Sequence, residues 1–393
     1  MKTRICERFG IEFPIFAFSH CRDVVAAVSR AGGLGMLGAL AFSPEQLEIE
    51  LKWIDEHVDG KPYGVDVVMP ASYAGSDLAK LQAMIPEQHK RFVEEVLERY
   101  EVPPLPEDEP QPESLLAWTH EKAKPQVEIA LSHPIKLIAN ALGTPPPDVL
   151  ERAHRRGVLV AALVGNAHQA RMQVEAGTDI IVAQGTEAGG HTGDVASLVL
   201  WPEVIDAVRP TPVLAAGGIG GGRQMAAALA LGADGVWTGS IWLTVREADT
   251  HPVVVQKLLN ASSRDTVRSR SMTGKPARLL RTAWTEAWDS AESPGALPMP
   301  LQYMLNAEAQ SRIYRSADKE GSRARELAGM PVGQIVGRMN SVRSVRDVIY
   351  DMVSEYVETV GRLSADLRGG SPGATNPPAA SRSRPAAPPS AGR

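Results

Sequence analysis

The sequence predicts an α/β fold, a (β/α)8 TIM barrel with a helical insertion after strand 3 and a helical C-terminal extension. Three observations lead to it: short apolar runs, helix patterns between most of them, and glycine-rich turns after the last two runs. Continuous apolar runs are typical of parallel strands that are buried on both faces. A doubly wound open sheet is the alternative, and the number of runs favours the barrel.

The predicted strands are apolar, partly β-branched, and too short for helices of ordinary length. The runs are Ile15–Phe18, Gly33–Ala39, Tyr63–Met69, Ile135–Leu142, Val158–Val164, Asp179–Gln184, Pro212–Gly218 and Gly235–Ser240.

Helix signals separate most of these strands. Residues 43–46, Ser-Pro-Glu-Gln, combine an N-cap serine, a proline at the first helical position and a glutamine at the third. Asn166 is positioned to cap a second helix, which we expect to stop at Gly177. A third, Gly222–Leu231, is expected to stop at Gly232. Strands and helices therefore alternate, as a barrel requires.

Two regions interrupt the alternation, so we divide the chain into four parts. Residues 1–70 and 134–246 form the barrel. Residues 71–133 form a helical insertion, interpreted as a lid or substrate-binding subdomain, with an oligomerisation arm as the alternative. Residues 247–367 are mainly helical and complete the substrate domain. Residues 368–393 lack an apolar period and are predicted to be a disordered tail.

Composition excludes several classes of protein. The 41 Lys+Arg against 46 Asp+Glu give a net charge of −5, which offers no basic surface for nucleic acid. No apolar run approaches the roughly 18 residues of a membrane span, and the N-terminus has no signal-peptide pattern. Cys6 and Cys21 cannot form a disulfide framework or a cysteine-only zinc site. We expect a reduced, cytoplasmic protein without a metal.

The glycine-rich turns predict a phosphate site. Residues 214–223, Leu-Ala-Ala-Gly-Gly-Ile-Gly-Gly-Gly-Arg, end the seventh strand and open a helix, whose first N–H groups would be free to bind an anion. The eighth strand ends in Gly239 and Ser240. In TIM barrels the loops after strands seven and eight often bind one phosphate together. The alternative is a pair of tight connections without a ligand.

A histidine follows the sixth strand. Residues 183–193, Ala-Gln-Gly-Thr-Glu-Ala-Gly-Gly-His-Thr-Gly, surround His191 with small side chains. An unperturbed imidazole, with a pKa near 6.5, can accept a proton from a carbon acid at neutral pH. Alternatively, the ring only bonds a neighbouring loop. Glu187 is either an acid that orients the loop or a solvated charge. Metal binding is disfavoured, because no second His or Cys stands at ligand spacing.

These motifs together resemble the nitronate monooxygenases, formerly called 2-nitropropane dioxygenases. The FMN-dependent enoyl-ACP reductases share the fold and the histidine loop. The matching strings are Ala-Gly-Gly-Leu-Gly at 31–35, Pro-Tyr-Gly-Val-Asp at 62–66, Ala-Gln-Gly-Thr-Glu-Ala-Gly-Gly-His at 183–191, Ala-Ala-Gly-Gly-Ile at 215–219 and Thr-Gly-Lys-Pro-Ala-Arg at 273–278.

The resemblance implies an FMN-binding barrel with His191 as the catalytic base. It also implies a small-molecule substrate and either O₂ or NAD(P)H as the redox partner. The residues implied to contact the cofactor are Gln184 and Gly185 at the flavin ring and Gly217, Gly218, Gly239 and Ser240 at its phosphate.

The chain also departs from the family. Residues 17–20, Ala-Phe-Ser-His, stand where the family usually has Gln-Ala-Pro-Met, and Asp66 replaces a usual Asn. We expect Ser19 and Asp66 to face the flavin and His20 to face the substrate. The alternatives are a turn hydroxyl, a hydrogen-bonded buried carboxylate and a surface ring, respectively.

Three functions follow from these features. The first is oxidation of a nitronate or nitroalkane by O₂ through FMN, with His191 as base. The second is an NAD(P)H-dependent FMN reductase or dehydrogenase that acts on an enoyl or other acyl thioester. The third is a barrel that binds a phosphorylated sugar or nucleotide without redox chemistry. A homodimer is left open.

Overall fold

The computed structural model describes residues 1, 3–69, 78–106, 120–141 and 143–368. Eight parallel strands close into a barrel in the order β1-β2-β3-β4-β5-β6-β8-β9. The predicted TIM barrel is therefore confirmed, and each predicted run overlaps one barrel strand. The strands are β1 (Ile15–Ser19), β2 (Leu34–Gly38), β3 (Tyr63–Asp66), β4 (Leu137–Asn140), β5 (Leu159–Val164), β6 (Ile180–Gln184), β8 (Val213–Ala216) and β9 (Gly235–Thr238).

Side chains that face the barrel axis form an apolar core. They come from alternate positions of the strands and include Phe16, Met36 and Val182. The short helix α1 (Arg4–Phe9) adds to this core, and Phe9 meets the ring of Phe16 edge-on with the ring centroids 5.4 Å apart. Because α1 packs beneath the strands, a site is expected at their carboxyl ends, as in other TIM barrels.

Helices cover the outside of the barrel, and two of them begin at the predicted caps. Ser43 and Gln46 exchange hydrogen bonds in a capping box at the start of α3. Asn166 caps α8 by accepting the N–H of Gln169 at 2.8 Å. These helices are α2 (Arg22–Arg30), α3 (Pro44–His57), α6 (His120–Ser132), α7 (Pro147–Arg155), α8 (Ala167–Glu175), α9 (Ser197–Val208) and α10 (Gly222–Ala230).

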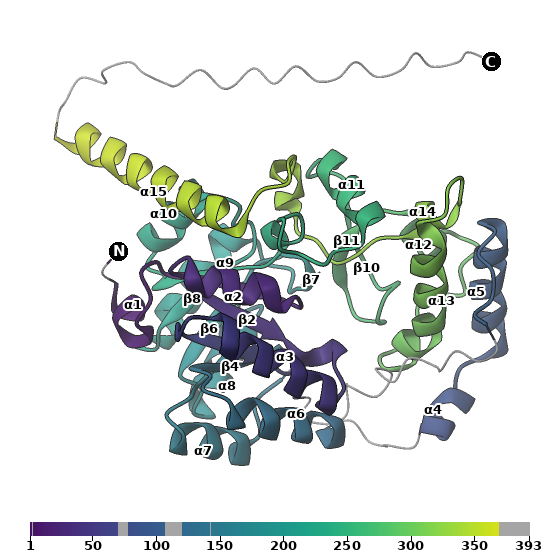
Figure 1. The fold of residues 1–393 in the computed structure, drawn as a ribbon, viewed down its shortest axis with the longest axis horizontal. Helices are drawn as coiled ribbons and strands as arrows, with labels where there is room; N and C mark the ends of the chain where they lie inside the picture. Colours follow the sequence, from purple (N-terminus) through teal and green to yellow (C-terminus); the bar gives the residue numbers. More distant parts are fainter. Residues whose placement is uncertain (2, 70–77, 107–119, 142, 369–393) are drawn as a thin grey trace.

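The last barrel helix comes late in the chain. After β9 the backbone leaves the barrel and returns as α15 (Val345–Leu367), which packs against α10 and α2 beside the β9–β1 pair (Figure 1). Buried Ile349 and Met352 join the core outside the strands. Glu247 holds the returning chain, because its carboxylate accepts the N–H of Val345 at 3.0 and 3.1 Å. The C-terminal extension therefore supplies one helix to the barrel.

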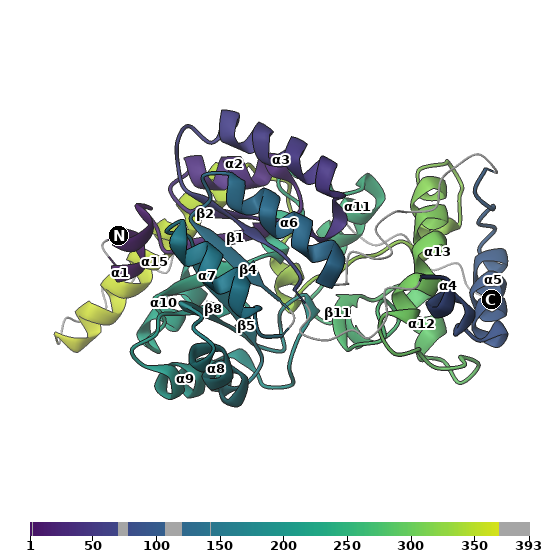
Figure 2. The same ribbon diagram turned by 90° about the horizontal axis from the view of Figure 1, so that it is seen from below.

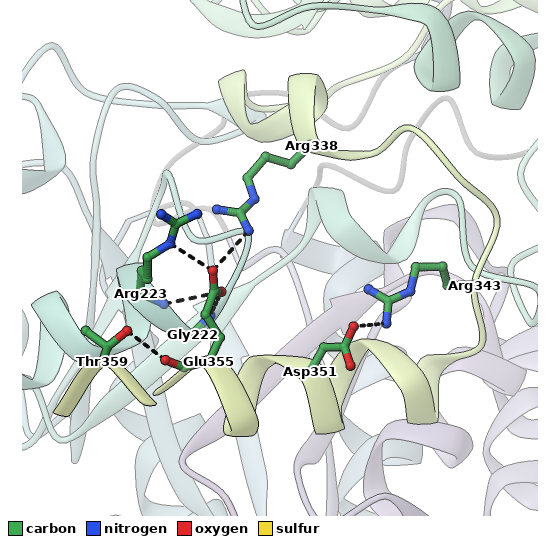
Figure 3. A network of polar contacts seen from close by, with 7 residues as sticks. All are labelled: Gly222, Arg223, Arg338, Arg343, Asp351, Glu355 and Thr359. Atoms are coloured by element: carbon green, nitrogen blue, oxygen red, sulfur yellow. Dashed lines mark hydrogen bonds and ion pairs between the residues drawn. The ribbon is translucent and has the colours of Figure 1, made fainter. Parts of the chain in front are cut away.

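Glu355 is a second anchor between α15 and the barrel (Figure 3). Its carboxylate accepts the backbone N–H of Gly222, at the start of α10, at 2.6 Å. It also pairs with Arg223 at 2.8 Å and Arg338 at 3.4 Å. A carboxylate at a helix N-terminus satisfies N–H groups and interacts favourably with the helix dipole.

A helical lobe stands beside the barrel (Figures 1 and 2). It combines helices from between β3 and β4 with helices from after β9. In the lobe α5 packs on α13, where Arg312 binds the carboxylate of Glu94 at 2.8 and 3.0 Å. Its helices are α4 (Leu78–Ala83), α5 (Glu87–Arg99), α11 (Pro252–Asn260), α12 (Ala283–Asp289), α13 (Leu301–Ala317) and α14 (Ala324–Leu327).

One helix of the predicted insertion packs on the barrel instead of the lobe. In α6, Val127 and Leu131 enter the core beneath α3, and Gln126 donates to the carbonyl oxygens of Ala39 and Phe42. Residues 70–77 and 107–119 of this region lie outside the described residues. The predicted tail also lies outside them, apart from Arg368.

A three-stranded antiparallel sheet links the lobe to the barrel, and the sequence did not predict it. β10 (Thr266–Ser269) pairs with β11 (Ala277–Leu280), which pairs in turn with β7 (Gly190–His191). β7 lies in the connection after β6. His191 is therefore on a short strand and not in a loop without partners.

Candidate active site

The mouth of the barrel is lined by side chains that face the axis where the strands end. On β3 the Tyr63 hydroxyl donates to Asp55 on α3 at 2.6 Å, so Tyr63 points outward. Alternation along the strand then turns Gly64 and Asp66 inward. On β6, Ile181 and Ala183 belong to the outer core, so Gln184 faces the axis. The structure thus brings Asp66 and Gln184 to one mouth.

Asp66 is buried and unpaired. Its side chain is 5% exposed, and no described residue donates a hydrogen bond to its carboxyl group. In the barrel ladder it stands between Gly38 of β2 and Ala139 of β4, neither of which offers a polar side chain. Burial raises the pKa of this carboxyl to about 7. The group is therefore half protonated near neutral pH, unlike an exposed aspartate.

The segment after β1 contributes His20 to the rim. Its Nδ1 lies 2.9 Å from the carbonyl oxygen of Gly38, and its ring meets Phe18 edge-on. The side chain keeps exposed surface within the mouth, where desolvation by the surrounding protein lowers the pKa of the imidazole despite the Gly38 contact. His20 is therefore placed to contact a ligand as a neutral ring.

Ser19 and Cys21, on either side of His20, are engaged in local structure. The Ser19 hydroxyl accepts the N–H of Cys21 at 3.1 Å, which makes it a turn hydroxyl. The Cys21 thiol donates to the carbonyl of Glu247 at 3.2 Å, and burial raises its pKa. A thiol held in this way is a poor nucleophile. The expected contact of Ser19 with a flavin stays a prediction.

His191 is fixed by the small antiparallel sheet. It pairs with Ala277 of β11, and its Nε2 lies 2.7 Å from the hydroxyl oxygen of Thr273. Burial, aided by the positive charge of Lys275, lowers the pKa of His191 to about 4. The imidazole is therefore neutral at pH 7, with a lower proton affinity than the sequence led us to expect.

Glu187 orients the histidine segment. Its carboxylate accepts the backbone N–H of Ser197 and, at 2.8 Å, the Ser197 hydroxyl at the start of α9. Arg278 donates to the carbonyl of Thr186 at 2.8 Å, and Arg268 donates to that of Thr192 at 3.1 Å. The first of the two interpretations of Glu187 is thus the one the structure supports.

The glycine turns after β8 and β9 leave space for an anion. Gly217 and Gly218 have φ of +93° and +71°, a region that disfavours other residues. A Cβ at Gly218 would meet its first neighbour only at 3.9 Å, and one at Gly239 would meet nothing within 4 Å. No hydrogen bond within the described residues uses the backbone N–H groups of Gly218 and Gly239. These donors fit a phosphate.

Part of the predicted phosphate site is already occupied by the protein. The N–H groups of Gly222 and Arg223, expected to be free, donate to Glu355 from α15 (Figure 3). The Ser240 hydroxyl accepts the N–H of Gly333 at 2.8 Å. The anion site is therefore centred on Gly218 and Gly239, upstream of the helix N-terminus.

Sequence reasoning missed the segment 331–334, which crosses the cradle. In addition to the Gly333 bond, Gln334 donates to the carbonyl of Glu187 at 2.9 Å. A Cβ at Gly333 would lie 2.7 Å from that same carbonyl oxygen. The signal available was the spacing of Gly329, Gly333 and Gly337 at every fourth residue, which marks close backbone approach.

Similarity to known proteins identifies the family of this chain. The family model described as nitronate monooxygenase matches residues 2–355. The chain belongs to the nitronate monooxygenase family. Its members are enzymes, and the chain is accordingly a flavin-dependent oxidoreductase. The resemblance drawn from the motifs is confirmed.

Individual relatives cover nearly the whole chain. A protein of Mycobacterium tuberculosis, provisionally named a monooxygenase, is 58% identical over 92% of this chain and 98% of its own. A nitroalkane oxidase of Streptomyces ansochromogenes is 26% identical with a TM-score of 0.73, covering 90% of this chain and 98% of that one. FabK of Thermotoga maritima is 29% identical with a TM-score of 0.70, covering 93% and 99%.

None of the described helices is long and apolar enough to cross a membrane. Within the described part of the chain, no three side chains of the His, Cys, Asp or Glu type gather as metal ligands would.

Proposed function

We propose that the protein binds FMN and oxidises a nitronate with O₂. The observation that carries the proposal is the surroundings of His191, a neutral imidazole held by Thr273 beside the cation of Lys275. The charge of Lys275 attracts an anion such as a nitronate, and the neutral ring of His191 adds no charge of its own that the substrate would have to displace. Membership of the family and the similarity to a nitroalkane oxidase support the same reaction.

The cofactor proposal assigns two groups of residues. The N–H groups of Gly218, Gly239 and Ser240 would hold the FMN phosphate. Gln184 and Gly185 would contact the ring, with Asp66 across the barrel. Bound flavin would supply the acceptor for two electrons from the substrate and pass them to O₂.

The low proton affinity of His191 favours the nitronate over the neutral nitroalkane. A base with a conjugate acid of pKa about 4 removes a carbon-bound proton only when the resulting charge pair is stabilised locally. A nitronate has already lost that proton, so His191 needs only to contact the anion and orient the reacting carbon. We therefore assign His191 first to positioning the anion and second to accepting a proton from a nitroalkane.

The helical lobe is proposed as the substrate-binding part of the enzyme. Thr273 and Lys275 lie in the connection between β10 and β11, which leads into the lobe. Gln302 and Asn306 of α13 donate to the carbonyl of Ser271 and so fix that connection. A substrate at His191 would therefore contact both parts of the molecule.

A second function is favoured by the similarity to FabK. The flavin would then take its electrons from NAD(P)H and deliver them to an enoyl or other acyl thioester, whose large carrier would extend along the lobe.

One experiment tests both functions. The FMN-loaded protein is mixed anaerobically with ethyl nitronate, nitroethane or NADH, and the visible absorbance of the flavin is followed. We expect rapid bleaching by ethyl nitronate, slower bleaching by nitroethane and none by NADH. Bleaching by NADH alone would select the second function. A purified protein that binds no FMN would refute both.

A further inference from the structure

Asp66 is a buried carboxyl group whose state the proposed reaction leaves unexplained. It faces the barrel axis, is 5% exposed, and receives no hydrogen bond from the described residues. Buried polar side chains nearly always have a partner, so one without a partner calls for an explanation. A ligand in the mouth is the partner that its position allows.

The barrel order places Asp66 opposite the phosphate cradle. Between β3 and β8 lie β4, β5 and β6 in one direction and β2, β1 and β9 in the other. A ligand anchored by its phosphate at Gly218 and extending across the mouth therefore ends at the wall that carries Asp66. That far end is where a flavin carries its ring.

The charges around Asp66 do not stabilise its ionised form. Its neighbours β2 (Leu-Gly-Met-Leu-Gly) and β4 (Leu-Ile-Ala-Asn) have no ionisable side chain. His20 is a titratable group on the rim, and it contacts the carbonyl of Gly38, the residue paired with Asp66. His191, in the connection after β6, is neutral at pH 7. Burial alone therefore governs the carboxyl and raises its pKa to about 7.

We infer, on the basis of the flavin function proposed above, that Asp66 accepts a proton when the bound flavin is reduced and returns it on reoxidation. Reduction by a nitronate or by dithionite brings two electrons, and with one proton these leave the flavin with one added negative charge. That negative charge raises the pKa of the nearby Asp66 carboxyl group, which therefore binds a proton more tightly. Both protons come from solvent: one forms the N–H bond of the reduced flavin, and the other forms the O–H bond of Asp66. An asparagine at this position could not take it up.

The test is the midpoint potential of the FMN-loaded protein as a function of pH. A two-electron couple that takes up one proton changes by about 30 mV per pH unit, and each further proton adds about 30 mV. For the wild type we expect about 30 mV per pH unit below pH 7, where Asp66 is protonated in both redox states. Above pH 7 the slope should steepen to about 60 mV. Above pH 7 the slope for D66N should therefore be about 30 mV per pH unit smaller than the slope for the wild type.

A matched control distinguishes the effect of the Asp66 carboxyl group from the general effect of removing one negative charge. Asp249 is an exposed aspartate on the rim near His20, and D249N removes the same charge without touching the barrel interior. D249N should keep the wild-type break. Loss of the break in D249N, or parallel slopes in the wild type and D66N, would overturn the assignment to Asp66.

The failures of the two proposals are distinguishable. A wild-type protein that binds no FMN removes the proposed function itself. A protein that binds FMN and is bleached by ethyl nitronate but shows no break in slope removes only the role of Asp66. If D66N does not retain FMN, the wild-type titration decides alone, since a break near pH 7 supports the inference and a straight line overturns it.

Discussion

Glu355 on α15 caps the start of α10 with its carboxylate, and replacing it by alanine would remove this cap. Its bond to the N–H of Gly222, at 2.6 Å, is a hydrogen bond to a charged group, a class that contributes about 1.5–3 kcal/mol. Its ion pairs contribute below about 1 kcal/mol, because Arg223 and Arg338 are 63% and 41% exposed. We therefore expect E355A to destabilise the protein by about 2–3 kcal/mol.

Thermal unfolding followed by circular dichroism measures this loss. In domains of 150–250 residues, 1 kcal/mol corresponds to about 2–4 °C, so the midpoint should fall by about 4–12 °C. E355Q keeps an acceptor for the N–H of Gly222, so its unfolding midpoint should fall less than that of E355A. Asp351 lies on the same helix, is 71% exposed and forms a surface ion pair with Arg343. D351A is therefore the matched control, and it should destabilise the protein by less than about 1 kcal/mol.

The pH dependence gives an independent check. Desolvation opposes ionisation of Glu355, but the positive charges of Arg338 and Arg223 and the helix N–H groups outweigh it and lower its pKa below the usual 4.5. The unfolded state therefore binds the proton more tightly, so the stabilisation is present above pH 4.5 and is lost as the pH falls below it. Equal midpoints for E355A and D351A at pH 7 would refute the cap as a stabilising contact.

Three further predictions concern the site. H191N should retain FMN and lower kcat/KM for ethyl nitronate by about 100-fold or more; turnover at the wild-type rate would exclude the assigned role. G218D should lose FMN, because its carboxylate would repel the phosphate. G60D is the control, since Gly60 has a similar φ (+68° against +71°) and open surroundings, and it should keep FMN. Equal flavin content in both variants would show that the phosphate binds elsewhere. K275A should raise KM for ethyl nitronate several-fold, whereas the control K52A, on the outer helix α3, should leave KM unchanged. Steady-state kinetics at low and high salt would show whether the effect of K275A is electrostatic.

The barrel could be predicted from sequence because its signals are local. Continuous apolar runs mark strands buried on both faces, and the Ser43 and Asn166 caps depend on residues three positions apart. The glycine turns could be identified for the same reason, and their role as a phosphate site stays a prediction. Each requires only a few neighbouring residues to agree.

What could not be predicted depends on contacts between distant residues. β7 is two residues long and becomes a strand only because β11 pairs with it. The start of α10 is closed by Glu355, 133 positions later in the chain. The low pKa of His191 arises from burial and from Lys275, and the unpartnered state of Asp66 arises because its register neighbours, Gly38 and Ala139, carry no polar side chain. No local pattern encodes these facts.

The late return of α15 has a consequence for how this enzyme can diversify. The chain departs at Glu247 and comes back at Val345, and these two residues are hydrogen-bonded to each other. The lobe helices between them, α11 to α14, could vary in length while these two residues stay joined and the barrel stays closed, provided that Thr273, Lys275 and Gly333 keep their contacts with the site. If the lobe binds the substrate as proposed, substrate choice could change without altering the barrel, and chimaeras joined at this pair that keep those contacts should fold.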